Sequence, residues 1–323
     1  MPARPMHPAR TRRRAVLAAP LLILALAGCS GSGDDTGGDT TAATTGDRST
    51  TATSTAATST TAPAVEVDQT PPVGANGIKI ADDDTVWIAS LGSDAILRVD
   101  TTTGRIVARI DAPAGSGPDD VALAPDGTLY WTGFLSGDVG VVDSGGDRTE
   151  VLANVGSGAN PIALRADGSL VVGRAGAATG LFSVDPSSNA PPVPLADPGN
   201  LNSFDIAPNG LLYAPSVNTA SVVEVDSATG ETIRTVATVL GVPIAVRWHD
   251  DELFALVLSD STRVVRIDPT TGATEVVADT GLPVADNLAV GDDGRIYVTG
   301  LNAPTITVVG PDGQVERTVR VGG

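Results

Sequence analysis

From residue 74 to the C-terminus, short apolar segments alternate with polar turns, and the alternation repeats. One copy contains the apolar segment Val121–Leu123, the turn Pro125-Asp126-Gly127, and a second apolar segment, Leu129–Trp131. Apolar segments of this length between turn residues are typical of β-strands, whereas an amphipathic helix would show a longer period. The pattern therefore predicts an all-β chain.

Aspartates in the turn between the third and fourth strands of each copy set the period. Asp100, Asp143, Asp185, Asp226 and Asp268 follow one another at steps of 43, 42, 41 and 42 residues. An aspartate at this place accepts hydrogen bonds from the backbone ahead of it, and a glycine that closes the turn tolerates a positive φ. We assign these aspartates to turns, without a catalytic role.

Four short strands per copy at this period are typical of a β-propeller blade. Six copies occupy the repeat region, so we predict a single six-bladed β-propeller with four antiparallel strands per blade. Alternating segments such as Ser221–Val225 put apolar faces between neighbouring blades. We expect Gln314–Val321 to be the outer strand of the sixth blade, with Val65–Val67 as an added strand beside it.

Residues 1–28 have the composition of a secretion signal. They contain five arginines and no acidic residue, and the apolar run Ala15–Ala27 follows the arginines. A basic start, a short apolar run and small residues before a cleavage site are typical of such signals, and this run is shorter than the about 20 residues of a membrane span. Arg12–Arg14 also fit a twin-arginine signal, so the export route stays open between that system and the general secretory one.

The tetrad Leu26-Ala27-Gly28-Cys29 resembles the lipobox of bacterial lipoproteins. In that motif the cysteine thiol receives a diacylglyceryl group and cleavage makes the cysteine the first residue. Cys29 is the only cysteine in the chain, which excludes internal disulfides and thiolate-rich metal sites. The resemblance implies a lipid-anchored protein on the extracytoplasmic face of the cell membrane; an ordinary signal peptide with an unrelated cysteine is the alternative.

Residues 29–63 connect the predicted anchor to the propeller, which we place at residues 64–323. Of the 34 residues from Ser30 to Pro63, 17 are Ser or Thr, and most others are Ala, Gly or Asp. A segment of this composition has too few apolar side chains to form a core, so we expect a disordered linker. Whether it is glycosylated stays open.

Charge and composition exclude several classes of function. The net charge is −18, and removal of the five signal arginines makes it −23. An acidic chain with few aromatic residues lacks the basic surface and the stacking platforms of nucleic-acid-binding proteins. Histidine occurs twice, and only His249 lies beyond the signal, which excludes catalysis by a histidine pair. We expect His249 in a surface turn.

One residue of each copy falls at the same level when the first strands are aligned, near one mouth of the central channel. Five of the six are polar, and the fifth copy, aligned through Val242–Arg247, carries Val242. The polar residues are Asn76, Asp119, Asn160, Asn202 and Asp286. Carboxylate and amide oxygens suit a hard cation such as Ca²⁺. A water-filled mouth whose polar side chains satisfy loop backbone groups is the alternative.

Two further charged residues lie deeper in the predicted channel. Lys79, the only lysine, follows Asn76 by three residues, and Asp205 has the same position on the opposite blade. Either they form a charge pair across the channel, directly or through water, or each faces a neighbouring blade. On the face opposite the polar ring we expect the turn that contains His249.

The phrases Ala124–Tyr130 and Ala207–Tyr213 resemble repeats of the six-bladed superfamily of senescence marker protein, gluconolactonase and luciferin-regenerating enzyme. They are also similar to repeats of NHL-type and streptogramin-lyase-like propellers. The superfamily resemblance implies a divalent metal held by one Glu, two Asn and one Asp at the level of the polar ring. In chain order these positions are Asn76, Asn160, Asn202 and Val242. The glutamate and the aspartate of the hydrolases are therefore absent.

We therefore predict an exported, lipid-anchored, monomeric propeller that binds a small molecule or a partner protein at the cell surface. The first alternative is a metal-dependent, lactonase-like hydrolase that uses the polar ring. A rotated set of Asp286, Asp119, Asn160 and Asn202 would supply it with two carboxylates and two amides. The second alternative is a lyase of the streptogramin type, which would need histidines at the channel mouth that the chain does not supply.

Overall fold

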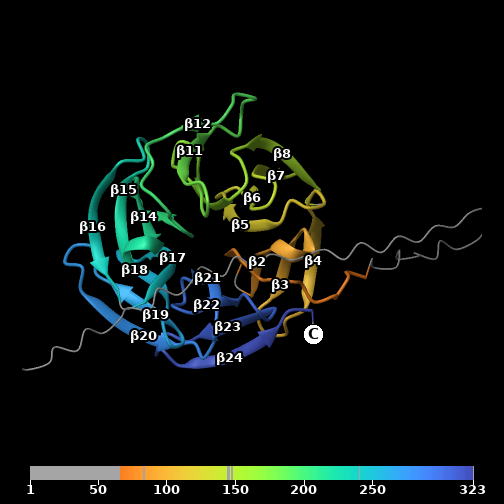
Figure 1. Cartoon of the computed structure of the whole chain (residues 1–323). Coiled ribbons are helices and arrows are strands. Elements are labelled where there is room, and N and C mark those ends of the chain that lie inside the picture. The colour runs from red at the N-terminus through yellow and green to blue at the C-terminus, as the bar shows by residue number, and fades with distance from the viewer. Residues whose placement is uncertain (1–65, 83, 144–145, 147, 240, 323) are drawn as a thin grey trace, which may run out of the picture. The chain divides into compact units, whose positions relative to one another are not determined.

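The computed structural model describes residues 66–82, 84–143, 146, 148–239 and 241–322. They form six four-stranded antiparallel sheets arranged around a common axis (Figure 1), which confirms the predicted six-bladed β-propeller. The predicted signal (residues 1–28), the lipidation site Cys29 and the linker to residue 63 lie outside the described residues. Within the described residues, no helix has the length and apolar character needed to cross a membrane.

Each blade is built from four consecutive strands, and the chain runs from the innermost to the outermost. The strands of the first three blades are β1 (Ile78–Asp82), β2 (Thr85–Ser90), β3 (Ala95–Asp100) and β4 (Ile106–Asp111); β5 (Pro118–Leu123), β6 (Leu129–Gly133), β7 (Asp138–Val142) and β8 (Thr149–Asn154); and β9 (Ala159–Leu164), β10 (Leu170–Arg174), β11 (Gly180–Val184) and β12 (Val193–Pro194).

The last three blades follow the same order. Their strands are β13 (Asp205–Ile206), β14 (Leu211–Ser216), β15 (Ser221–Asp226) and β16 (Thr232–Thr238); β17 (Val242–His249), β18 (Glu252–Leu258), β19 (Thr262–Ile267) and β20 (Thr274–Asp279); and β21 (Ala285–Val290), β22 (Ile296–Gly300), β23 (Thr305–Val309) and β24 (Val315–Arg320). Two 3-10 turns, η1 (Leu91–Ser93) and η2 (Val217–Thr219), join the second and third strands of blades one and four.

The repeated aspartates lie in turns between third and fourth strands, as predicted. Asp100 Oδ1 accepts hydrogen bonds from the backbone nitrogens of Thr103 (2.8 Å) and Thr102 (2.9 Å), and the bond from Thr103 is the main reason that the pKa of Asp100 is lowered. Gly104 closes the turn with a φ of 77°, and a Cβ there would overlap the carbonyl oxygen of Arg320 in the sixth blade. The repeated turn therefore also fixes the contact with a neighbouring blade.

The hydrophobic core is divided among the six junctions between neighbouring blades. Each cluster of buried side chains takes members from two adjacent blades; Ile96 and Trp131, for example, pack together between blades one and two. The ring of Trp131 is fully buried and lies against Gly140, where a Cβ would overlap the indole. This placement confirms that the alternating strands put apolar faces between blades.

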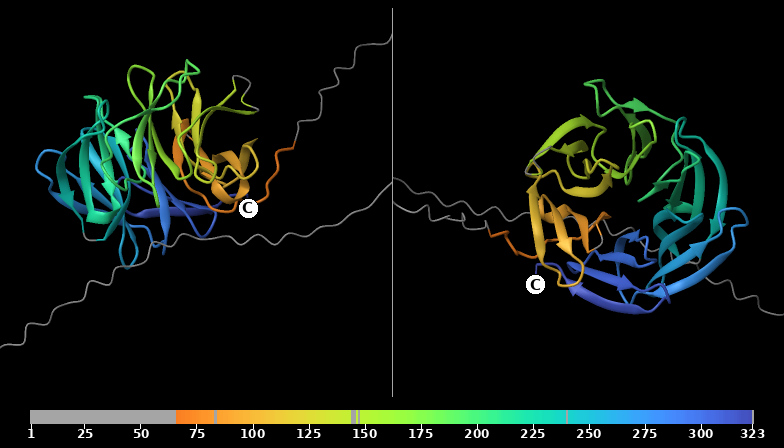
Figure 2. Two further views of the ribbon diagram at one scale, coloured as in Figure 1. Left: turned by 45° about the horizontal axis from the view of Figure 1, so that its top comes forward. Right: turned by 180° about the vertical axis from the view of Figure 1, so that it is seen from behind.

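Blades one and six close the propeller without exchanging a strand. The sixth blade has its own outer strand, β24, and no strand forms at residues 66–67, so the predicted added strand is wrong for its described part. Instead, Gln69 Nε2 donates to the Ile106 carbonyl (2.8 Å) and the Ile106 nitrogen donates to Gln69 Oε1 (3.0 Å) at the start of β4. Figure 2 shows the C-terminal end nearby, where the Gly322 nitrogen donates to the Gly104 carbonyl (2.9 Å).

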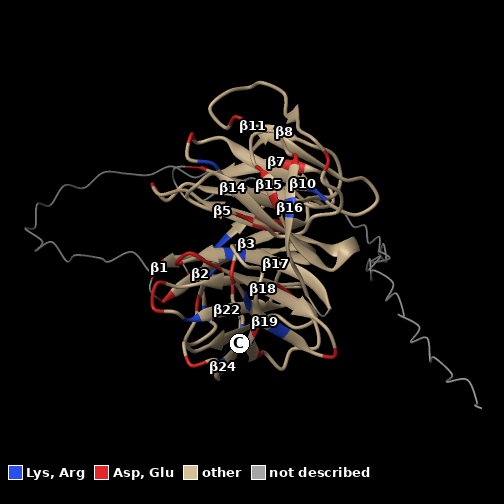
Figure 3. Cartoon of the chain, turned by 90° about the vertical axis from the view of Figure 1, so that its left-hand side faces the viewer, with Lys and Arg blue, Asp and Glu red and all other residues tan. Residues whose placement is uncertain are grey.

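Acidic residues occur in the turns of several blades (Figure 3). Asp226 and Asp268, for example, each accept two backbone hydrogen bonds in their turns, and these bonds lower the pKa of both carboxyl groups. A large part of the acidic excess therefore has a structural explanation, and carboxyl groups outside such turns are the stronger candidates for function.

Candidate functional site

The register of the inner strands shows which residues of the six blades share a level in the channel. Ser203 of blade four and Ala245 of blade five face each other in a parallel bridge, so the residue that corresponds to Asn202 is Ile244. The predicted alignment through Val242 is therefore wrong by two residues. The reason is that β17 extends from Val242 to His249 and carries an irregularity in its pairing with β18, which a repeat of constant length does not reveal.

We call the residues at the first level the mouth ring: Asn76, Asp119, Asn160, Asn202, Ile244 and Asp286. Two members, Asn76 and Asp119, are in direct contact. Asn76 Nδ2 donates to Asp119 Oδ1 at 3.0 Å, both side chains are buried, and Asp286 is close enough for its charge to affect Asp119. The side chains of Asn160 and Asn202 make no hydrogen bond to another ring member among the described residues; Asn202 Oδ1 accepts its neighbour's nitrogen, from Ser203. The structure thus brings together part of the predicted ring.

The two carboxyl groups of the mouth ring lack a cationic partner. Burial raises the pKa of Asp286 to about 7, and the charge of Asp120 adds to the increase while that of Arg247 opposes it. Burial raises the pKa of Asp119 well above its usual value, and the charge of Asp286 adds to that increase. Among the described residues, no arginine or lysine lies within ion-pair distance of either carboxylate. When both carboxyl groups are ionised, their negative charges repel each other and no ion pair in the described part of the chain offsets them.

An unpartnered oxygen adjoins this pair. Asn76 Oδ1 is buried, and no described group donates a hydrogen bond to it. Buried polar atoms are nearly always hydrogen-bonded, so an orphan atom needs an explanation, and a hard cation with oxygen ligands is one that suits all three side chains. The described residues contain no group of three or more His, Cys, Asp or Glu placed to hold a metal. A cation here would therefore complete its coordination with amide and water oxygens.

A polar network lies one level below the mouth ring, on the channel axis. Ser203 Oγ donates to Asp120 Oδ2 (3.0 Å), and Asn287 Nδ2 donates to Ser203 Oγ (2.9 Å) and to Asp120 Oδ1 (3.3 Å). Arg247 donates from one terminal nitrogen to Ser203 Oγ (2.8 Å) and Asn287 Oδ1 (2.6 Å), and its guanidinium is 3.9 Å from Asp120. We call Asp120, Ser203, Arg247 and Asn287 the central network.

Three members of the central network come from every second blade, and Arg247 reaches them from blade five. Asp120, Ser203 and Asn287 come from blades two, four and six, so their mutual hydrogen bonds must cross the channel. At the same level the odd-numbered blades contribute small or apolar residues, and at Gly77 a Cβ would be 2.6 Å from the Cα of Asp120. The predicted ring missed this network because it took Asp119, Asn202 and Asp286 rather than the residue after each of them, and because blade five was misaligned. The sequence does carry one signal of the network: in blades two, four and six the residue after the mouth-ring position is polar.

Below the network lies a small cavity of about 120 Å³, lined by Lys79, Asp205, Arg247 and Trp248 among others. Burial is the main cause that lowers the pKa of Lys79, and the Arg247 charge adds to the decrease while Asp205 opposes it. Lys79 and Asp205 line the same cavity, yet no ion pair within 4.0 Å joins them in the described part of the chain. Asp205 Oδ2 instead accepts the Trp248 nitrogen at 3.1 Å.

His249 ends β17, on the face opposite the mouth ring as predicted. Its side chain is half-buried, with 18% exposed, and lines a cleft at the surface. The ring contacts Phe254 edge-on with centroids 6.5 Å apart, and Nε2 lies 3.4 Å from Asp250 Oδ2. The histidine therefore lies in a cleft and is remote along β17 from the mouth ring.

A comparison with known proteins gives the fold a context. A family model described as strictosidine synthase-like, N-terminal, matches residues 105–141, and a comparison with curated proteins finds no significant match. A streptogramin B lyase structure is similar with a TM-score of 0.59 and 16% identity, over 77% of this chain and 84% of that chain.

Two other similar structures come from the group named by the sequence resemblance. One is a calcium-binding protein, regucalcin, from Agrobacterium tumefaciens (TM-score 0.55, 18% identity, 72% of this chain and 83% of that chain). The other is provisionally described as a gluconolactonase (TM-score 0.58, 14% identity, 73% of this chain and 88% of that chain). At these identities the likeness shows the fold, which supports the predicted resemblance to six-bladed propellers.

We predict that Asp286→Asn stabilises the protein at neutral pH when a chelator is present. A carboxyl group whose pKa rises to about 7 on folding binds its proton more tightly in the native state, so its contribution to stability is present at low pH and is lost as pH rises from about 4 to 7. At pH 8 the variant should be more stable by about 1 kcal/mol or more, or about 2–4 °C in Tm. At about pH 3, below the pKa of the unfolded carboxyl group, the difference should vanish. Thermal unfolding of both proteins at the two pH values checks this, and equal Tm values at pH 8 would contradict it.

Proposed function

We propose that this chain is an exported, lipid-anchored propeller that binds a ligand or partner at the cell surface through a cation held in its mouth ring. The signal-like residues 1–28, Cys29 and the Ser/Thr-rich linker support the export and anchoring. The carboxyl groups of the buried Asp119 and the half-buried Asp286, together with the unpartnered Asn76 Oδ1, support the cation. Together these features support a binding domain that the Ser/Thr-rich linker holds outside the cell membrane.

The observation that carries the cation proposal is the orphan oxygen of Asn76 next to two uncompensated carboxyl groups. Ca²⁺ takes six to eight oxygen ligands, and Asp119, Asp286 and Asn76 would provide the protein's share. Water would occupy the remaining positions. An oxygen of a ligand, such as a carboxylate or hydroxyl group, could replace that water, so the ion would give the mouth a place to bind oxygen-rich molecules.

The mouth ring suits binding better than hydrolysis. Where the lactonase resemblance places a glutamate and an aspartate, this chain has Asn76 and Ile244, and Ile244 carries no group that can accept a proton. A general base must lie within hydrogen-bond reach of the proton it removes. The carboxyl groups that remain, Asp119 and Asp286, are the ones that the cation would occupy. A lyase that depends on histidine is also unsupported, because His249 lies at the other end of its strand.

We expect divalent cations to raise the Tm of the protein, and Asp119→Asn to abolish the rise. A ligand that binds only the folded state stabilises it by about 2.7 kcal/mol at one hundred times its Kd. Thermal unfolding in EDTA, Ca²⁺, Mg²⁺, Mn²⁺ and Zn²⁺ identifies the ion. Glu150→Gln, which removes an exposed carboxylate of β8, is the matched control and should keep the full shift.

An enzyme assay with the ion that raises the Tm most distinguishes a binding function from hydrolysis. The proposal expects no turnover when a panel of lactones is incubated with the protein and that ion. Lactone hydrolysis that disappears in Asp119→Asn would replace the binding function with the hydrolase. An unchanged Tm in every ion would remove the cation from the proposal.

We expect Cys29→Ser to release the protein from the membrane. Without the thiol no diacylglyceryl group can be attached, and a single domain with an acidic surface has no other predicted anchor. Fractionation of cells that express either form should find the unsubstituted protein with the membranes and the variant in the extracytoplasmic soluble fraction. Cys29→Ser found with the membranes in the same amount would contradict the anchor.

A further inference from the structure

A cleft of about 540 Å³ lies between blades five and six, on the face opposite the mouth ring. Blade five contributes His249 and residues of β18, β19 and β20, and blade six contributes the turn at Asp292–Gly294 and the turn at Gly310–Gly313. Its volume is in the range of small-molecule sites, about 300–1,000 Å³. The resemblance to lactonases and lyases concerns the mouth ring, so this cleft belongs to neither candidate activity.

The walls of the cleft are strongly acidic. Six carboxyl residues line it, against the single guanidinium of Arg266: Asp250, Glu252, Glu275, Asp292, Asp293 and Asp312. Arg266 is shared between Glu275 (2.5 Å) and Glu252 (3.5 Å). Asp293 pairs with Arg295 (2.6 Å) just outside the cleft, so two guanidinium groups compensate part of that charge. Asp292 makes no hydrogen bond or ion pair within the described residues. Four of the six accept no backbone hydrogen bond of a turn, whereas Asp293 and Asp312 accept one each, from the nitrogens of Arg295 and Gln314.

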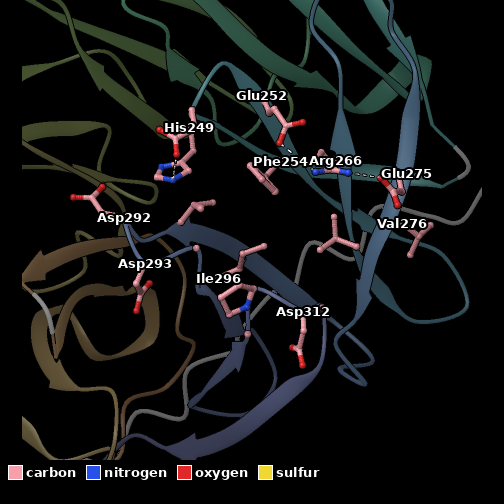
Figure 4. Close-up of a pocket in the computed structure, with 17 residues that line it drawn as sticks. His249, Glu252, Phe254, Arg266, Glu275, Val276, Asp292, Asp293, Ile296 and Asp312 are labelled. Atoms are coloured by element: carbon pink, nitrogen blue, oxygen red, sulfur yellow. Dashed lines mark hydrogen bonds and ion pairs between the residues drawn. The ribbon is translucent and has the colours of Figure 1, made fainter.

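The floor of the cleft is apolar. Phe254, Val277, Val290 and Ile296 line it, and Val276 at the rim is 57% exposed. Figure 4 shows Phe254 and Ile296 in the middle, with Glu252, Glu275, Asp292 and Asp312 placed around them. Apolar surface left open to water between charged groups gains free energy when a hydrocarbon segment covers it, at about 25 cal/mol per Å².

We infer that this cleft binds a linear organic cation, in which two or more amino groups are joined by a methylene chain. Ammonium groups donate several hydrogen bonds and match carboxylates such as Asp292 and Asp312 on one side and Glu275 on the other. The methylene chain covers the half-buried Phe254 and the exposed Val276 between them. A hydrated metal ion gains nothing from the apolar floor, and an anion is repelled by the walls.

This site is independent of the proposed cation in the mouth ring. The two lie on opposite faces, and the central network of Asp120, Ser203, Arg247 and Asn287 stands between them in the channel. The test uses the Asp286→Asn chain as background, which removes a mouth-ring carboxylate. Failure of one proposal then leaves the other unaffected.

Calorimetric titration of the full chain with spermidine tests the inference. We expect saturable one-to-one binding to the Asp286→Asn chain that Mg²⁺ at the same concentration does not reproduce, because Mg²⁺ has no hydrocarbon chain. Adding Asp292→Asn and Asp312→Asn should weaken binding about tenfold, since two exposed charge contacts are each worth up to about 1 kcal/mol. The Asp312→Asn change keeps a side-chain oxygen that can accept the Gln314 nitrogen, so the turn is retained.

The matched control removes the same amount of charge elsewhere. Glu150→Gln with Glu231→Gln neutralises two exposed carboxylates on blades two and four and should leave spermidine affinity within about twofold, because charges more than a Debye length away are screened. Equal losses in the two double variants would show unspecific attraction to an acidic surface and overturn the site. Binding of Mg²⁺ as tight as that of spermidine would also overturn it.

Discussion

The convergence of six inner strands on one axis is the constraint on which the rest of this propeller depends. At the level of the central network, side chains of all six blades would meet, and there is room for only some of them. The chain alternates: Asp120, Ser203 and Asn287 reach the axis from even-numbered blades, while Gly77 in blade one lies so close to Asp120 that a Cβ would overlap it. Arg247 then binds Ser203 and Asn287 from blade five. Removing one partner of such a buried charge network typically costs about 3–5 kcal/mol.

The same constraint shapes the mouth ring. Because Arg247 is committed to the central network and to the carbonyl of Phe204 (3.0 Å), it lies too far from Asp119 and Asp286 to pair with them. Its charge lowers the pKa of Asp286, yet burial still raises that pKa to about 7. The two carboxyl groups can be neutralised by protons or, as we propose, by a cation from solution. In the central network the charge of Asp120 is offset by Arg247, whereas the carboxyl groups of the mouth ring have no ion-paired arginine or lysine among the described residues. This difference is the physical basis of the proposed cation site.

The sequence predicted what depends on local structure. Blade number, strand order and turn chemistry follow from short-range alternation and from aspartates such as Asp100, and all of these are confirmed. The register of blade five could not be predicted, because the extra length and the irregular pairing of β17 shift Ile244 into the place assigned to Val242. The central network was also missed: Ser203 meets Asp120 from 83 residues away, and its one trace in the sequence is the polar residue that follows the ring position in alternate blades.

The central claim is that the mouth ring binds a divalent cation, and diffraction from crystals grown with Ca²⁺ tests it most directly. We predict an anomalous peak between Asp119 and Asp286, at about 2.3–2.6 Å from their carboxylate oxygens and from Asn76 Oδ1, with water at the remaining positions. A mouth ring without such a peak, in which Asn76 Oδ1 accepts a hydrogen bond from water alone, would contradict the account.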